Sequence, residues 1–128
     1  MIFGAHVLIY TADADADRAF FRDVLGLSHV DVGHGWLIFR LPPSEVAVHP
    51  ADEGAPLSHD TPGMVGAHLY LMCDDLEGEI RALAAKGVKC TPVQQERWGI
   101  RTAIRLPSGG ELGLYQPKHP TAFQASGC

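Results

Sequence analysis

Two histidines hold equivalent places in two nearly identical stretches of the chain. His6 is the third residue of GAHVLIY (residues 4–10), and His68 is the third residue of GAHLYLM (residues 66–72). An imidazole can exchange a proton near neutral pH or bind a metal ion. On a strand face it is more often an ordinary hydrogen-bonded residue, so the chemistry of this pair depends on its neighbours.

The side chains expected beside these histidines follow from strand alternation, because residues two apart share a face of a sheet. They combine carboxylate, phenol, indole, imidazole and guanidinium groups, a mixture typical of a small-molecule pocket. We therefore predict a ligand cleft on this face. The substrate-binding candidates are Tyr10, Trp36, Arg40, Tyr70, Met72, Trp98, Arg101 and Arg105, and the catalytic candidates are Glu45, His49, Glu111 and Tyr115.

Some of these candidates also have a simpler interpretation. Arg40 and Arg105 each precede a Leu-Pro turn, and for both an ion pair with a nearby glutamate is favoured over an oxyanion-binding role. Trp36 and Trp98 are each either a stacking wall for a ligand or a packing residue. Trp98, beside Gly99 in a charged stretch, is the better binding candidate of the two.

Two amphipathic helices are predicted to support the strands. DADADRAFFRDVLGL places Phe20, Val24 and Leu27 on one stripe, and DDLEGEIRALAAKGV repeats the pattern in the second half. Each helix has aspartates as candidate N-caps and a glycine as its stop. The second stripe is Leu76, Ile80, Leu83 and Ala84, the caps are Asp13 or Asp15 and Asp74 or Asp75, and the stops are Gly26 and Gly87.

The repeat extends into the later strands. RLPPSEVAVHP (residues 40–50) parallels RLPSGGELGLYQP (residues 105–117), so each half has the order β-α-β-β-β. We predict an α+β fold with two βαβββ modules, residues 1–50 and 66–117, joined by a linker (51–65) and followed by a poorly ordered tail (118–128), together one domain. The faces expected against the helices comprise Val7, Ile9, Leu37, Phe39, Leu41, Val46 and Val48, and Leu69, Leu71, Cys73, Leu112 and Leu114.

Composition narrows the classes of function. Hydrophobic residues make up 46% of the 128 residues and charged residues 20%, as in a soluble globular domain. The net charge of −5 and the scattered basic residues argue against nucleic acid and anionic membranes as partners. Without an apolar span or a signal peptide, a cytoplasmic protein is expected. Cys73, Cys90 and Cys128 lack CxxC spacing and indicate neither a disulfide framework nor a zinc site.

Taken together, HVLIYTADADADRAFFRDVLGL, HLYLMCDDLEGEIRALAAKG and RLPSGGELGLYQP resemble the vicinal oxygen chelate superfamily. That superfamily contains glyoxalase I, extradiol dioxygenases, fosfomycin-resistance enzymes and bleomycin-resistance proteins. The resemblance implies paired mixed sheets that curl around a cleft, with the helices on the outer face. It also implies a divalent metal, whose first-strand ligands fall on His6 and His68.

The last-strand ligand of the metal-using relatives, usually a glutamate, falls on Gly113 and on Ala47, which cannot bind a metal. Glu111 lies two residues upstream, about 6 to 7 Å along the strand. A bulge at the preceding glycines could bring it to the ion. His6, His68 and Glu111 would then form a metal-binding site suited to Fe, Mn, Zn or Ni, with Glu45, His49 or Tyr115 as the base.

Two functions therefore remain open. The first is a metal-dependent lyase, isomerase or dioxygenase that acts on a small oxygenated molecule. The second is a metal-free protein of the bleomycin-resistance type that sequesters a cationic or aromatic drug or metabolite. The resemblance implies a homodimer in either case, and no nucleotide cofactor is expected.

Overall fold

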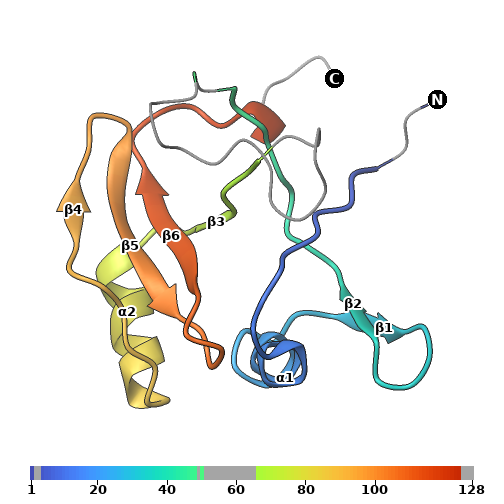
Figure 1. Cartoon of the computed structure of the whole chain (residues 1–128). Coiled ribbons are helices and arrows are strands. Elements are labelled where there is room, and N and C mark those ends of the chain that lie inside the picture. The colour runs from blue at the N-terminus through green and yellow to red at the C-terminus, as the bar shows by residue number, and fades with distance from the viewer. Residues whose placement is uncertain (2–3, 49, 51–65, 125–128) are drawn as a thin grey trace.

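The computed structural model describes residues 1, 4–48, 50 and 66–124. His49, residues 51–65, which hold the predicted linker, and residues 125–128 of the tail lie outside the described residues. The fold is α+β, as predicted (Figure 1). Its elements are α1 (Ala14–Asp23), β1 (His29–Asp31), β2 (Leu37–Phe39), β3 (Tyr70–Met72), α2 (Leu76–Ala85), β4 (Gln94–Gln95), β5 (Gly99–Arg105), β6 (Glu111–Pro117) and a short 3-10 helix, η1 (Ala122–Gln124).

The second half forms a four-stranded sheet in the order β3-β6-β5-β4. β3 runs parallel to β6, which requires the crossover through α2, whereas β5 is antiparallel to both β6 and β4. The register aligns Tyr70 with Gly113 and Met72 with Tyr115, and it aligns Arg101 with Tyr115. Because aligned residues share a face, the predicted phasing of these strands is confirmed.

The core lies between α2 and the other face of this sheet (Figure 1). Asp75 caps α2 by accepting a hydrogen bond from Gly78 N at 3.1 Å, and Gly87 ends it with a φ of 78°. Leu76 is fully buried, whereas Ala84, predicted on the same stripe, is exposed. The core consists of Phe20, Leu76, Leu83, Ile104, Leu106, Leu112 and Leu114, with Leu69, Leu71, Cys73 and Ile80 packed against it.

The first half contains α1 and the antiparallel pair β1-β2. Asp13 caps α1, Gly26 follows it with a φ of 68°, and the Phe39 ring meets the Phe21 ring edge-on at 5.4 Å. These features match the sequence pattern, including the predicted burial of Phe20 and the half-burial of Val24 and Leu27. The helix itself is shorter than the stripe, because Leu27 lies beyond the end of α1.

The outer strands predicted for the first half are absent from the described residues. Residues 4–11 and 44–48 run without strand pairing, and Val46 and Val48 are 90% and 95% exposed instead of covered by α1. Val7 and Ile9 are also exposed. The prediction of helix-covered strands here is wrong for this single chain. Alternation marks one face as apolar, but it does not identify the surface that buries it.

The two halves are joined by a buried carboxylate. Asp17 of α1 accepts hydrogen bonds from Ser108 N at 3.1 Å and Ser108 Oγ at 2.7 Å, in the turn between β5 and β6. A second contact joins the helices, because Lys86 Nζ at the end of α2 donates to the Val24 carbonyl oxygen at 3.2 Å. These contacts hold α1 beside the four-stranded sheet.

The described part of the segment that follows β6 extends to η1. Ala122 N donates to Glu45 Oε1 at 2.8 Å, which ties η1 to the first half. In Figure 1, η1 and the green segment that precedes residue 49 lie at the same end of the molecule. The two residues are 77 positions apart, so this hydrogen bond could not be predicted from the local sequence pattern.

Candidate functional site

Three aromatic rings from three parts of the second half form the centre of the candidate site. Tyr70 of β3, Trp98 before β5 and Tyr115 of β6 make up this aromatic cluster. The Trp98 and Tyr115 centroids lie 5.0 Å apart, and Tyr70 lies 5.6 Å from Tyr115 and 6.0 Å from Trp98. All three pairs meet nearly edge to face, the arrangement that aromatic quadrupoles favour.

The rings differ in how much surface they offer. Tyr115 is 8% exposed and forms the floor of the cluster, whereas Trp98 is 38% exposed. Tyr70 is half-buried between them. The cluster therefore presents an indole and a phenol edge to solvent over a buried phenol. Such a surface suits a flat organic molecule.

Gly113 makes this arrangement possible. It is aligned with Tyr70 in the parallel pair of β3 and β6, and the Tyr70 ring lies directly over it. A Cβ atom built on Gly113 would collide with the ring, coming within 2.6 Å of Cε1 and 2.7 Å of Cγ. The space that a side chain at position 113 would occupy is therefore filled by Tyr70.

A polar chain borders the cluster on the side of the C-terminal segment. The Tyr115 hydroxyl lies 3.1 Å from His119 Nε2, and the same nitrogen lies 4.0 Å from Glu45 Oε2. Burial is the main cause that raises the pKa of Tyr115, and the charge of Glu45 raises it further. Glu45 and Tyr115 were both predicted catalytic candidates, and the structure brings them together through His119.

Arg101 lies on the same face, because it is aligned with Tyr115 across β5 and β6. Its Nε donates to Glu96 Oε1 at 3.2 Å, and its Nη2 donates to Gln94 Oε1 at 2.6 Å. This partly buried ion pair holds the guanidinium at the edge of the cluster. Arg101 is thus oriented by its neighbours before any ligand is present.

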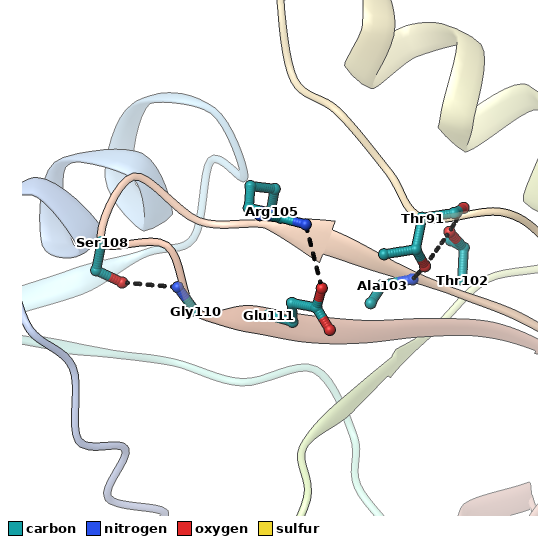
Figure 2. Close-up of polar contacts among 7 residues, drawn as sticks. All are labelled: Thr91, Thr102, Ala103, Arg105, Ser108, Gly110 and Glu111. Atoms are coloured by element: carbon teal, nitrogen blue, oxygen red, sulfur yellow. Dashed lines mark hydrogen bonds and ion pairs between the residues drawn. The ribbon is translucent and has the colours of Figure 1, made fainter.

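The Arg105 and Glu111 side chains pair at the turn end of the hairpin that β5 and β6 form (Figure 2). Arg105 Nη2 donates to Glu111 Oε2 at 3.4 Å, and both side chains are about half exposed, at 57% and 50%. The ion-pair interpretation of Arg105 is confirmed. At this exposure the pair contributes little to stability, but it directs the Glu111 carboxylate toward Arg105.

The metal ligands implied by the resemblance do not come together in this chain. His6 and His68 are exposed. Within residues 1, 4–48, 50 and 66–124, no three His, Cys, Asp or Glu side chains form a group that could hold a metal ion. Position 113 lacks a side chain and is covered by a tyrosine, and Glu111 is paired with Arg105. The residues present therefore do not fit a three-ligand metal site.

Of the other predicted binding residues, Met72 is aligned with Tyr115 of the aromatic cluster, whereas Trp36 packs against α1. The Arg18 guanidinium of α1 stacks at 4.5 Å over the Trp36 ring, so Trp36 packs on the α1 side of the first half. The alternation used for its prediction does not apply, because Trp36 belongs to the turn before β2. Tyr10 and Arg40 are exposed, whereas Met72, half-buried, is in register with Tyr115.

A groove of about 580 Å³ opens on the helix side of the molecule, away from the aromatic cluster. It lies between the end of α1 and α2, with Leu71, Ile104 and Leu114 in its lining. Cys73 also lines it, and burial is the main cause that raises the pKa of this thiol to about 11. Its lining also includes the charged residues Asp74, Glu79 and Lys86, but none of the residues predicted to be catalytic.

Sequence reasoning missed His119. It lies in KHPTAFQASGC, which shows no periodicity, and its partners Tyr115 and Glu45 come from different halves. Only its position just after the last strand of the cleft face could have singled it out.

The fold and site together define a class of protein: an α+β domain of the glyoxalase type, whose open sheet face carries an aromatic surface suited to a small molecule. The chain belongs to the Glyoxalase/Bleomycin resistance protein/Dioxygenase superfamily, whose sequence profile matches residues 5–112. This is the vicinal oxygen chelate superfamily predicted from the sequence. Membership supports a general small-molecule-binding role.

Solved structures agree on the fold. The antibiotic-binding protein TnmS3 from Streptomyces sp. CB03234 is 20% identical, with a TM-score of 0.51 over 92% of this chain and 100% of that chain. A lactoylglutathione lyase from Agrobacterium tumefaciens is 23% identical, with a TM-score of 0.55 over 84% and 88%. A glyoxylase/bleomycin resistance protein/dioxygenase domain from Frankia sp. EAN1pec is 19% identical, with a TM-score of 0.58 over 92% and 99%.

No curated protein matches the chain. Among the described residues, no helix has both the length and the apolar character needed to cross a membrane.

Proposed function

We propose that this protein binds a small, flat, cationic aromatic molecule at the aromatic cluster without using a metal ion. The observation that carries the proposal is the Tyr70 ring seated over Gly113. In metal-using relatives a ligand side chain is expected at this position, as the resemblance implies. Here the Tyr70 ring occupies that space and forms part of an aromatic surface. Such a surface is suited to stacking on a ligand and not to binding a metal.

The charge around the cluster favours a cation. Glu45 places a carboxylate beside Tyr115 and His119, and the chain has a net charge of −5. A positively charged ring system would gain from the faces of Trp98 and Tyr70 as well as from the carboxylate. Arg101 does not oppose it strongly, because Glu96 already balances the guanidinium.

The alternative function is metal-dependent, glyoxalase- or dioxygenase-like action on a small oxygenated molecule. It rests on the equivalent positions of His6 and His68. It requires Glu111 to leave Arg105 and move two residues along the strand toward the histidines. The pairing of β5 with β6 continues through Arg105 and Glu111 without a bulge. We therefore favour binding over metal-assisted catalysis.

Isothermal titration calorimetry with N-methylquinolinium, a flat permanent cation, tests the proposal at pH 8. We expect saturable binding, tighter than that of neutral quinoline, and a loss of at least about tenfold in affinity for Trp98→Ala. Trp36→Ala removes the other indole and is the matched control, because Trp36 packs on Arg18 outside the cluster. Equal losses in the two variants, or no binding by the wild-type protein, would refute the proposal.

We also propose that the protein acts as a homodimer in the cytoplasm. The support for a dimer is the apolar surface on residues 7–9 and on Val46 and Val48, which no element of the described chain covers. Exposed apolar residues concentrated on two unpaired segments are typical of an interaction surface. Most soluble oligomers are assembled from identical chains, so we propose a second copy of this chain as the partner.

A further inference from the structure

The C-terminal segment places one imidazole between the two halves of the molecule. His119 Nδ1 lies 2.8 Å from the Pro120 carbonyl oxygen, which can only accept, so Nδ1 carries the proton of the neutral ring. Nε2 is then an acceptor and receives the hydrogen bond of the Tyr115 hydroxyl at 3.1 Å. Glu45 Oε2 lies 4.0 Å from the same nitrogen, beyond hydrogen-bonding distance.

We propose that His119 is a positioning residue that makes ligand binding at the aromatic cluster depend on pH, by exchanging Tyr115 for Glu45 as the partner of its Nε2 atom. The inference rests on the proposed binding of a cationic aromatic molecule. Neutral His119 holds the Tyr115 hydroxyl and leaves the Glu45 carboxylate its full charge. Protonated His119 donates through Nε2 instead, which turns it toward the carboxylate and offsets the charge that attracts the ligand.

The groups around the imidazole support this exchange. Tyr115 on β6 and Glu45 from the first half face it directly, and Tyr70 on β3 faces the Tyr115 ring. Lys118, the adjacent cation in the chain, donates at 3.2 Å and 3.4 Å to oxygens of residues 95 and 96 instead. Ala122 N holds Glu45 Oε1, so the carboxylate stays in place while His119 changes partner.

The tautomer of His119 tests the geometric basis without a ligand. Nitrogen-15 NMR of the labelled full chain should show neutral His119 as the Nδ1–H tautomer at high pH. On acidification we expect Nε2 to become protonated, with a concerted shift of the Tyr115 ring resonances. An Nε2–H tautomer at high pH would overturn the inference, because Tyr115 could not then donate to that nitrogen.

Calorimetry with N-methylquinolinium tests the functional consequence, because this probe keeps its charge at every pH. From pH 8 to pH 5.5, the range over which histidines change charge, wild-type affinity should fall about tenfold. His119→Gln offers an amide oxygen to Tyr115 but does not titrate, so its affinity should change less than about twofold. His29→Gln, at an exposed position of β1, should keep the wild-type profile.

The outcomes separate this inference from the proposed function. A fall of the same size in His119→Gln and in the wild-type protein would overturn the role of His119 while leaving the binding site intact. An absence of binding by the wild-type protein at pH 8 would overturn both. Glu45→Gln removes the charge that the imidazolium offsets, so it should bind weakly at pH 8 and show the same flat profile as His119→Gln.

Discussion

The absence of a side chain at Gly113 leaves room for the Tyr70 ring in the aromatic cluster. A glutamate at this position would project from β6 into the space that the Tyr70 ring fills. Without a Cβ, the strand lets a phenol ring come close to the backbone, where it also meets Trp98 and Tyr115 edge-on. Close approach of a ring to the backbone is a frequent reason for glycine within a strand.

Gly113→Ala should therefore disturb both the site and the fold. The added Cβ forces the Tyr70 ring to move, which should lower the free energy of unfolding by about 1 to 3 kcal/mol and weaken N-methylquinolinium binding. Urea unfolding and calorimetry measure the two effects. Gly110→Ala is the matched control, because its Cβ would meet only Ser108 Oγ at 3.5 Å, an ordinary contact. Equal behaviour of the two variants would contradict the close packing of Tyr70 on β6.

The sequence predicted that Tyr70, Trp98 and Tyr115 line the ligand cleft, but it did not predict the contact of Tyr115 with His119. Tyr70 and Tyr115 were placed on the cleft face by alternation, and the register of β3 and β6 confirms that they share it. The contact of Tyr115 with His119 depends on how the chain turns after β6. The segment after that turn is tied to the first half by a hydrogen bond from Ala122 N to Glu45 Oε1, which local pattern does not encode.

At the level of elements, the two halves differ in how well the sequence predicted them. The second half supplies most of the core, so alternation, helix period and caps all lead to the same structure, including which face of each strand is buried. In the first half, α1 and the Phe39 contact were predicted correctly. Its outer segments have the same apolar alternation but no covering element within the described chain, so pattern alone could not settle their structure.

The link between α1 and the hairpin of β5 and β6 is a further element-level prediction. Asp17→Ala removes the carboxylate that accepts two hydrogen bonds from Ser108, the shorter of them 2.7 Å from the hydroxyl. We expect the free energy of unfolding to fall by about 2 to 3 kcal/mol in urea titrations. Asp15→Ala is the control. Asp15 lies two residues earlier in α1 and its side chain is 96% exposed, so this variant should change the free energy of unfolding little. A small change for Asp17→Ala would mean that the halves are held together mainly by packing.

For the whole molecule, the exposed apolar segments lead to a prediction about assembly. We expect the wild-type protein to sediment as a dimer at micromolar concentration. Val46→Asp combined with Val48→Asp should shift it to a monomer, because buried carboxylates without partners oppose association. Val93→Asp, at an exposed valine next to β4, should leave the dimer intact. A wild-type monomer, or a dimer insensitive to both substitutions, would contradict this assignment of the interface.

Under the proposed function, the cluster of Tyr70, Trp98 and Tyr115 binds its ligand without a metal ion. The most direct test is calorimetry with N-methylquinolinium on protein stripped with a chelator, repeated after Mn²⁺ or Zn²⁺ is added. We predict the same affinity with and without added metal, and no metal-dependent change in the His6→Ala/His68→Ala variant. Binding that appears only after metal is added, and is lost in the double histidine variant, would contradict it.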